Sequence, residues 1–322
     1  MLKSIFLLLA IAMSASSAVK VEKTAYRGWP NCYRISNGTV ELIVTGDVGP
    51  RIIRYGFAGG QNLFKEFDEQ MGKTGEADWQ ARGGHRLWIS PEDKVKTYAP
   101  DNRPVRIKVL ADGVEATEPV EPLTGLEKTI TIHLAATGSA VEVVHQIRNA
   151  GHSPYELAPW ALTMFAQGGT GVHGFPPRGK HPVDLDATNP LVMWVYTNLA
   201  DKRWGLLNKY LVLHQDPHNP VGQKLGSYNK DTWGAYLLNG DLFVKHAAAT
   251  APVSAYPDFG CSFETFTNND FLELETLGPF GKVLPNQAIT HTERWTLHRN
   301  VHVAAWTDAE IDRAILPLVT AK

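Results

Sequence analysis

The chain has 322 residues, of which 43% are hydrophobic and 20% are charged, and its formal net charge is −2. This composition supports a sizeable hydrophobic core and excludes a low-complexity or disordered chain. Basic residues form no long runs, which argues against nucleic acid or an anionic membrane surface as a partner.

The N-terminus has the features of a secretory signal. Lys3 supplies a positive charge, Ile5 to Met13 form an apolar run of about nine residues, and small residues follow up to Ala18. The run is too short to span a membrane, which needs about 20 apolar residues. We therefore predict a signal peptide at residues 1–18 and a mature chain that is secreted or periplasmic. The alternative is a buried N-terminal strand or a retained anchor.

The rest of the chain has the two-residue periodicity of β-strands. In Glu127–Leu134, isoleucine and leucine alternate with threonine and histidine, which is typical of a strand with one buried face. Similar runs occur at Thr39–Thr45, Arg51–Phe57, Val105–Leu110, Ala140–Arg148, Leu191–Tyr196, Leu242–Lys245, Ser262–Phe266, Phe271–Leu277 and Ile289–His298. Glycine-rich turn signals separate them. We expect one all-β antiparallel domain over residues 19–322, with no membrane-spanning segment.

Two segments depart from the strand pattern. Gln167–Asn189 is rich in glycine, proline and histidine, and it is expected to be a long loop. Thr307-Asp308-Ala309-Glu310 has the capping-box pattern that opens a helix, and Pro317 is expected to end it. The sequence therefore predicts a short C-terminal helix.

A first candidate site lies at Gln80–Trp88, where Arg82, His85 and Trp88 surround a Gly-Gly pair. Arginine and histidine donate hydrogen bonds to hydroxyls, and tryptophan offers a flat apolar face to a sugar ring. We therefore expect a polar loop with an aromatic platform. The alternative is a turn with surface charges.

A second candidate site combines Trp160 with the strand that carries Glu273 and Glu275. Residues two apart on a strand share a face and lie ~6.5 Å apart, so the two carboxylates are expected to be neighbours. Trp160 either lines a groove or fills the core, and the two acids either serve a site or pair with arginines on an exposed face.

The sequence does not favour a metal site or a cofactor site. His214-Gln215-Asp216-Pro217-His218 lacks the spacing of a metal site, so no metal is expected. The sequence has no glycine-rich phosphate loop and no Cys-x-x-Cys motif, so no cofactor is expected either. For Cys32 and Cys261 two alternatives stay open: a disulfide, if the compartment is oxidising, or two buried free thiols.

The order of several motifs resembles the galactose-mutarotase-like superfamily, and within it an uncharacterised bacterial family. The motifs are Gly49-Pro50-Arg51-Ile52-Ile53, Arg82-Gly83-Gly84-His85, the segment from Asn149 to Trp160, and Leu274-Glu275 followed by Leu284-Pro285-Asn286-Gln287. The resemblance implies a β-supersandwich with a sugar site on the concave face of one large sheet.

The resemblance also implies roles for residues. Mutarotases use a glutamate to take the proton of the anomeric hydroxyl and a histidine to protonate the ring oxygen, and Glu275 matches that glutamate. The strand of the acid histidine reads Pro159-Trp160-Ala161 here, so Trp160 stands where the histidine is expected. His85 could substitute as the acid, because its ordinary pKa suits proton transfer.

The sequence therefore predicts a sugar-recognising protein, with Glu275 and His85 as catalytic candidates. The candidates for substrate binding are Arg51, Arg82, Trp88, Trp160 and Glu273. The leading hypothesis is an enzyme of the aldose-epimerase type. The alternatives are a sugar-binding module without catalysis and a relative of polysaccharide lyases or hydrolases.

Overall fold

The computed structural model describes residues 19–320, so the predicted signal peptide at residues 1–18 lies outside the described residues. The structure is 43% strand and 6% helix, and its strands form two antiparallel sheets. The predicted all-β antiparallel fold is confirmed. Within residues 19–320, no helix combines the length and the apolar character needed to cross a membrane.

The larger sheet has eleven strands, and its face away from the core carries the candidate site. Its spatial order is β1 (Lys20–Tyr26), β2 (Trp29–Ser36), β3 (Val40–Val44), β4 (Ile52–Phe57), β5 (His85–Ser90), β10 (Tyr155–Phe165), β19 (Leu272–Leu277), β18 (Phe263–Thr267), β15 (Gln223–Ser227) and β12 (Leu191–Met193), with β20 (Gly281–Val283) paired to β10.

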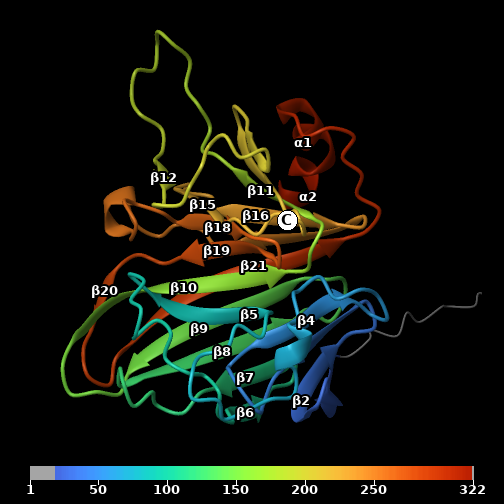
Figure 1. The fold of residues 1–322 in the computed structure, drawn as a ribbon, viewed down its shortest axis with the longest axis vertical. Coiled ribbons are helices and arrows are strands. Elements are labelled where there is room, and N and C mark those ends of the chain that lie inside the picture. The colour runs from blue at the N-terminus through green and yellow to red at the C-terminus, as the bar shows by residue number, and fades with distance from the viewer. Residues whose placement is uncertain (1–18, 321–322) are drawn as a thin grey trace, which may run out of the picture.

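The smaller sheet has ten strands and packs against the larger one (Figure 1). Its order is β13 (Trp204–Leu206), β14 (Tyr210–His214), β11 (Thr170–Gly174), β16 (Trp233–Leu238), β17 (Asp241–His246), β21 (Ala288–His298), β9 (Val141–Asn149), β8 (Leu126–Leu134), β7 (Gly113–Thr117) and β6 (Arg106–Val109).

One hydrophobic core joins the two sheets, because strands of both sheets alternate buried and less buried residues. In β8 the pattern is strictly alternating, and Ile130 and Ile132 are fully buried. The centre of the core is an aromatic cluster in which the ring of Phe64 lies 5.7 to 6.2 Å from four others. Aromatic rings bury large areas, so this cluster fixes the spacing of the sheets.

The C-terminal helices cover one end of the smaller sheet (Figure 1). α1 (Asp308–Ala314) begins where Thr307 accepts a hydrogen bond from the Glu310 amide at 3.3 Å, as the capping-box pattern predicts. The predicted end was wrong, because α1 ends at Ala314 and Pro317 lies in the first turn of α2 (Leu316–Thr320). Proline is tolerated there because first-turn amides have no partner within the helix. Two 3₁₀ turns, η1 (Asp68–Gln70) and η2 (Val253–Ala255), complete the helical segments.

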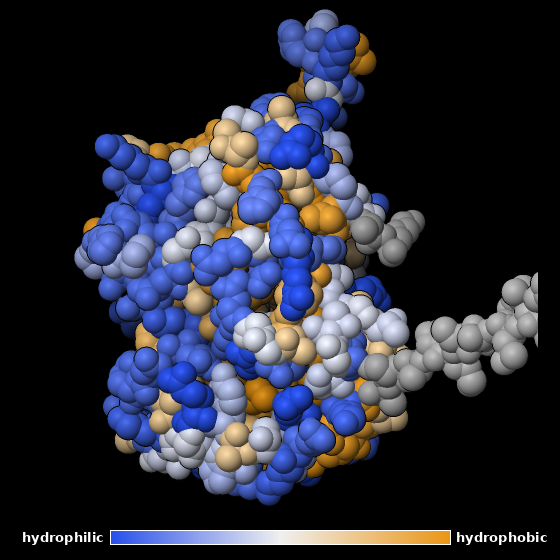
Figure 2. Space-filling model, turned by 90° about the vertical axis from the view of Figure 1, so that its right-hand side faces the viewer, coloured by the Kyte–Doolittle hydropathy of each residue, from blue (hydrophilic) through white to orange (hydrophobic). Residues whose placement is uncertain are grey.

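The predicted loop Gln167–Asn189 is only partly a loop. It contains β11, and residues 175–190 then form an arm that projects beyond the sheets (Figure 1). Figure 2 shows this arm projecting at the top, mostly hydrophilic with some hydrophobic surface. Val183 and Leu185 on it are 80% and 77% exposed.

Both cysteines, Cys32 and Cys261, are buried and free. Burial raises the pKa of each thiol above its ordinary value. Of the two alternatives for the cysteines, the structure has the buried thiols.

Candidate functional site

Strand β5 builds one wall of the site, although the sequence interpretation treated this segment as a polar loop. Gly83 and Gly84 have positive φ angles, and a side chain on Gly84 would lie 2.4 Å from the Ile52 carbonyl oxygen. The chain can therefore pass close to β4 only with glycine there. Beyond the glycines the strand alternates, so that His85 faces the core and Arg86 faces outward.

The outward side chains of β5, β10, β19 and β15 converge on a pocket of about 220 Å³. This volume lies below the roughly 300–1,000 Å³ of pockets for drug-sized ligands. Its walls are mainly aromatic, formed by Trp79, Trp88, Tyr98, Trp160, Tyr196 and Phe271. The Trp79 and Trp88 rings are 5.0 Å apart, and the Trp88 and Trp160 rings are 5.5 Å apart.

Arg86 and Glu273 form the polar centre of the pocket. Arg86 Nη1 lies 3.1 Å from Glu273 Oε1, and both side chains are at least nine-tenths buried. The Arg86 guanidinium also stacks over the Trp88 ring at 4.2 Å. Arg86 Nε, Arg86 Nη1 and Glu273 Oε1 have no hydrogen-bond partner in the described part of the chain. Buried polar atoms are rarely left unpartnered, so these atoms suit a ligand that both donates and accepts.

Glu275 lies beneath the pocket wall rather than in it. It is fully buried, and its Oε2 accepts hydrogen bonds from Trp160 Nε1 at 2.8 Å and Lys224 Nζ at 2.9 Å. Lys224 also pairs with Glu264 at 2.7 Å, and its ammonium lies 4.6 Å from the Trp160 ring. Of these three ionisable groups, Lys224 lines the pocket.

The charged groups in and behind the pocket, which we call the pocket layer, are all buried: Arg86, Lys224, Glu264, Glu273 and Glu275. Burial and neighbouring charges change the pKa values of Glu273, Glu264 and Lys224. Burial raises the pKa of Glu273 to about 7, with Arg86 acting against the shift and Glu275 adding to it. Burial, together with the neighbouring Glu275, raises the pKa of Glu264 well above its ordinary value. Burial alone would lower the pKa of Lys224, but the two carboxylates raise it well above the ordinary value. Glu273 is thus a pocket group that can exchange a proton near neutral pH.

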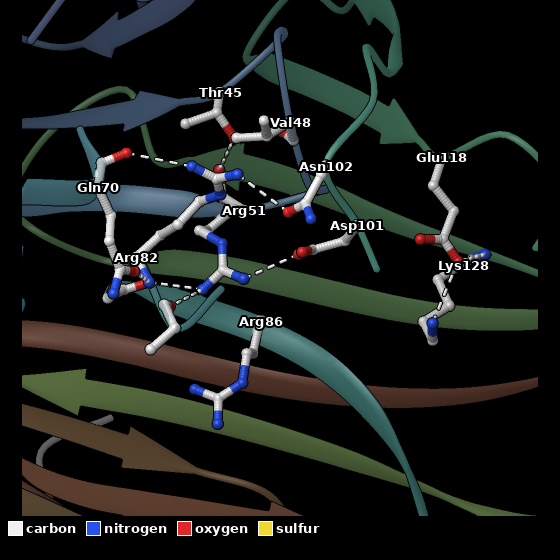
Figure 3. A network of polar contacts seen from close by, with 12 residues as sticks. Thr45, Val48, Arg51, Gln70, Arg82, Arg86, Asp101, Asn102, Glu118 and Lys128 are labelled. Carbon is white, nitrogen blue, oxygen red and sulfur yellow. Dashed lines mark hydrogen bonds and ion pairs between the residues drawn. The ribbon is translucent and has the colours of Figure 1, made fainter. Parts of the chain in front are cut away.

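The expected placement of Arg51 and Arg82 in the site was wrong, because both guanidinium groups are fully buried among loops (Figure 3). Arg51 donates to the Ala81 and Gly83 carbonyls at 2.8 and 2.7 Å and pairs with Asp101 at 2.8 Å. Arg82 pairs with Glu76 at 2.6 Å. In Figure 3, Arg86 lies apart from this network. The two arginines therefore hold the loops that carry the pocket wall.

The expected placement of His85 was also wrong, because it lies in the core on the other face of β5. His85 Nδ1 is 2.8 Å from the Thr163 hydroxyl, and His85 Nε2 is 2.7 Å from His145 Nε2. Burial lowers the pKa of His85 well below its ordinary value. His85 does not line the pocket, so it cannot touch a ligand bound there.

The core cluster around His85 is a complete polar network. Lys245 Nζ donates to Thr163 Oγ1 at 3.0 Å and pairs with Glu293 at 2.7 Å. Because His145 Nδ1 lies 2.9 Å from the His291 carbonyl oxygen, it must donate, and His145 Nε2 must then accept from His85. None of these atoms is unpartnered within residues 19–320.

Three side chains of the core cluster are of the types that bind metal ions. His85, His145 and Glu293 offer ligand atoms within 4.8 Å of one another. The Lys245 ammonium already pairs with Glu293, and a proton already joins the two imidazoles. The existing bonds satisfy the same atoms that a metal would use. The geometry therefore fits a structural network better than a metal centre.

A larger groove of about 670 Å³ runs beside α2 on the smaller sheet. Its charged groups are exposed and paired, as in the Arg294–Glu142 ion pair with side chains 74% and 39% exposed. The smaller pocket is the stronger candidate, because buried and unpartnered polar atoms gather there.

Of the candidates from the sequence, Trp88, Trp160 and Glu273 line the pocket, and Glu275 lies directly behind it. The interpretation missed Arg86, Lys224, Glu264 and Trp79. Arg86 could have been found by treating His85–Ser90 as an alternating strand, because Arg86 and Trp88 then share a face. Lys224 had no comparable signal, since Gln223–Ser227 is short and mixed in polarity.

No protein-family model matches the chain, and no curated protein matches it in sequence. Solved structures do match in fold. A Synechocystis sp. PCC 6803 protein superposes with a TM-score of 0.54 and 10% identity, over 91% of this chain and 100% of the other. A galactose mutarotase-like protein from Lactobacillus casei gives 0.52 and 10%, over 83% of this chain and 100% of the other.

A third similar structure is a Klebsiella pneumoniae protein named as a proposed aldose 1-epimerase. It has a TM-score of 0.54 and 9% identity, over 92% of this chain and 85% of the other. At such identities the likeness concerns the fold alone. The chain thus has the fold of the galactose mutarotase-like proteins.

Proposed function

We propose that this protein binds a single sugar ring in the aromatic pocket at Arg86 and Glu273. The observation that carries the proposal is the combination of flat aromatic walls with a buried ion pair, Arg86–Glu273, whose donor and acceptor atoms have no hydrogen-bond partner in the described residues. A sugar hydroxyl donates to a carboxylate and accepts from a guanidinium at the same time. The faces of a sugar ring are apolar enough to lie against tryptophan.

The test is calorimetric titration of a panel of monosaccharides against the protein. Trp88→Leu keeps apolar bulk but removes a flat wall, and it should weaken binding at least about tenfold. The matched control is Trp306→Leu, because Trp306 packs against the C-terminal helices and is remote from the pocket lining. Equal weakening by both variants would contradict binding at this pocket.

A second candidate function is anomer interconversion of the bound sugar, the reaction to which the name aldose 1-epimerase refers in one protein of similar fold. The favouring observation is that burial raises the pKa of Glu273, a pocket-lining group, to about 7. A proton-transfer group works best when its pKa lies near the working pH. We propose Glu273 for this role in place of His85, and Glu275 as the group that holds Trp160 and Lys224 behind it.

The measurement is NMR exchange between anomers. If the protein is an enzyme, Glu273→Gln should lower the rate roughly 10²–10⁴-fold, while Glu275→Gln should have a smaller effect. A wild-type rate equal to the spontaneous rate would leave binding as the function. A polysaccharide hydrolase is less favoured, because it needs two carboxyls that flank the bond, and Glu275 is buried behind Trp160.

We also propose that the chain is exported. The support is the pattern of a basic start, a short apolar run and small residues over positions 1–18. Fractionation of bacterial cells that express the full chain, compared with a chain lacking residues 2–18, tests the proposal. Retention of both forms in the cytoplasm would contradict it.

A further inference from the structure

The charges around the pocket do not balance. Arg86 and Lys224 supply two positive charges, while Glu264, Glu273 and Glu275 supply three carboxyl groups, and all five residues are at most 6% exposed. In the described residues, Glu273 pairs with Arg86, and both Glu264 and Glu275 pair with Lys224. The buried layer therefore holds one more carboxyl group than it has cations.

A further buried cation, Lys245, does not correct this imbalance. Lys245 lies on the core side and is matched by Glu293 at 2.7 Å. At the mouth of the pocket, the exposed Glu92 adds another carboxyl, whose partner is the Tyr98 hydroxyl at 2.6 Å. An uncompensated carboxylate is costly to bury. We therefore expect that, without a ligand, one of the three carboxyls holds a proton in place of the missing cation.

A ligand can reach one of the three carboxyls. Glu264 and Glu275 are fully buried behind Lys224, whereas Glu273 lines the cavity. Both pocket cations are already engaged, since Lys224 lies between two carboxylates and Arg86 lies against Glu273 and Trp88. An anionic ligand would add to the excess negative charge, whereas a cationic ligand would complete the set.

We propose that the sugar bound in this pocket carries a free amino group, and that its ammonium pairs with the Glu273 carboxylate. The inference rests on the proposed sugar binding and names the class of sugar. The ammonium replaces the proton that otherwise occupies the layer, while hydroxyls elsewhere on the ring bond Arg86. Aromatic walls favour the same charge, because an ammonium is attracted to ring faces.

The test compares matched sugars at pH 7 by calorimetry: a hexose, the same hexose with a free amine at one ring position, and the N-acetylated form. The amine has a positive charge that the other two lack. A charge-assisted hydrogen bond in a buried site should make the amino sugar bind about tenfold tighter or more. The panel includes glucose and galactose derivatives with the amine at different ring positions, so that it also identifies the position that Glu273 prefers.

Variants then locate the effect. Glu273→Gln should remove the preference for the amine, so that the amino sugar and the neutral hexose bind this variant with equal affinity. Glu142→Gln is the matched control, because it removes a carboxyl on the smaller sheet that does not line this pocket, and it should keep the preference. Thermal unfolding of each variant checks that it is folded. If Glu273→Gln does not fold, the comparison of the three sugars in the wild type still decides.

The outcomes separate this inference from the function on which it rests. Sugar binding without a preference for the amine, or tighter binding of a sugar acid, would overturn the inference and leave the proposed function standing. Binding of none of the sugars would overturn both. An amine preference that persists in Glu273→Gln would overturn the assignment of the ammonium to Glu273.

Discussion

Two buried layers of charge lie on opposite sides of the larger sheet, and they differ in completeness. On the core face, Lys245 balances Glu293, and hydroxyls, imidazoles and an indole occupy the remaining positions. On the pocket face, two cations meet three carboxyls, and several atoms have no partner. β5 contributes His85 to the first layer and Arg86 to the second.

The number of atoms without a hydrogen-bond partner distinguishes a structural polar network from a binding site when both are buried. A network that only stabilises the fold gains nothing from open hydrogen bonds, so its atoms pair with one another. A site that waits for a ligand must keep atoms that the ligand will satisfy. By this criterion the core layer is structural, although it contains the histidine that the sequence first suggested as an acid.

The largest expected effect follows from breaking the core layer. Lys245→Met leaves Glu293 buried without its cation, and removal of one partner from a buried pair costs about 3–5 kcal/mol. Urea unfolding measures the loss. The control is Lys209→Met, where a surface pair with Asp312 is removed and the loss of stability should be much smaller, because solvent screens exposed pairs. A Lys245→Met variant as stable as the control would refute the assignment of this layer.

Acid should act mainly on the core layer. Burial lowers the pKa of His291 to about 3, so the unfolded chain binds a proton below pH ~6.5 that the folded chain does not. The resulting stability is fully present above pH ~6.5 and is lost as the pH falls toward 3. Between pH 6 and pH 4 this one group contributes a loss of roughly 2–3 kcal/mol.

A His291→Gln variant should therefore lose less stability than the wild type over that interval, measured as the free energy of urea unfolding at each pH. Gln can still donate to Thr276, whose hydroxyl lies 2.7 Å from His291 Nε2. His302→Gln, at an exposed position, is the control. Parallel pH curves for the wild type and His291→Gln would show that His291 is not held neutral.

The pocket layer should respond to pH with the opposite sign. The folded-state pKa of Glu273, about 7, lies above its ordinary value of 4.5. Its contribution to stability is therefore fully present below pH ~4.5 and is lost as the pH rises through 7. Relative to the wild type, Glu273→Gln should gain roughly 2–3 kcal/mol between pH 5 and pH 8. A constant difference between the two proteins across that range would argue against an unbalanced pocket.

The smallest expected effect comes from removing one indole donor from each layer. Trp295 Nε1 donates to Glu293 in the core, and Trp160 Nε1 donates to Glu275 behind the pocket, both at 2.8 Å. Replacing either tryptophan with phenylalanine removes the donor. The core variant should lose about 1 kcal/mol more in urea unfolding, because the complete network has no spare donor there. A larger loss for Trp160→Phe would reverse the distinction.

The sequence predicted the fold better than the site. Alternation in Glu127–Leu134 and Ala140–Arg148 was strong because each strand has one face in the core, and β8 and β9 follow these runs closely. β16 has no such alternation, since five of its six residues are buried, and it was missed. Continuous burial removes the period on which strand prediction depends.

The errors at the site have one physical origin. Successive side chains on a strand point to opposite faces. If the alternation in β5 is assigned one residue out of register, the residues that face the core are therefore taken to face the pocket, and the reverse. Treating residues 80–88 as a loop left no basis for separating His85 from Arg86. Contacts between distant strands, such as Lys224 with Glu275 at 2.9 Å, depend on pairing order in the sheet and have no local signature.

The arm at residues 175–190 offers a point of entry for engineering. It connects β11 of the smaller sheet to β12 at the edge of the larger one, and its tip is exposed. Exposed loop tips with few contacts tolerate insertion and cutting of the chain. A peptide tag placed between Asp184 and Leu185, or a protease cut after Lys180, would leave both sheets with their partners. The halves of a cut chain should stay together and keep the pocket, so the arm can carry a tag or a label that does not contact the pocket lining.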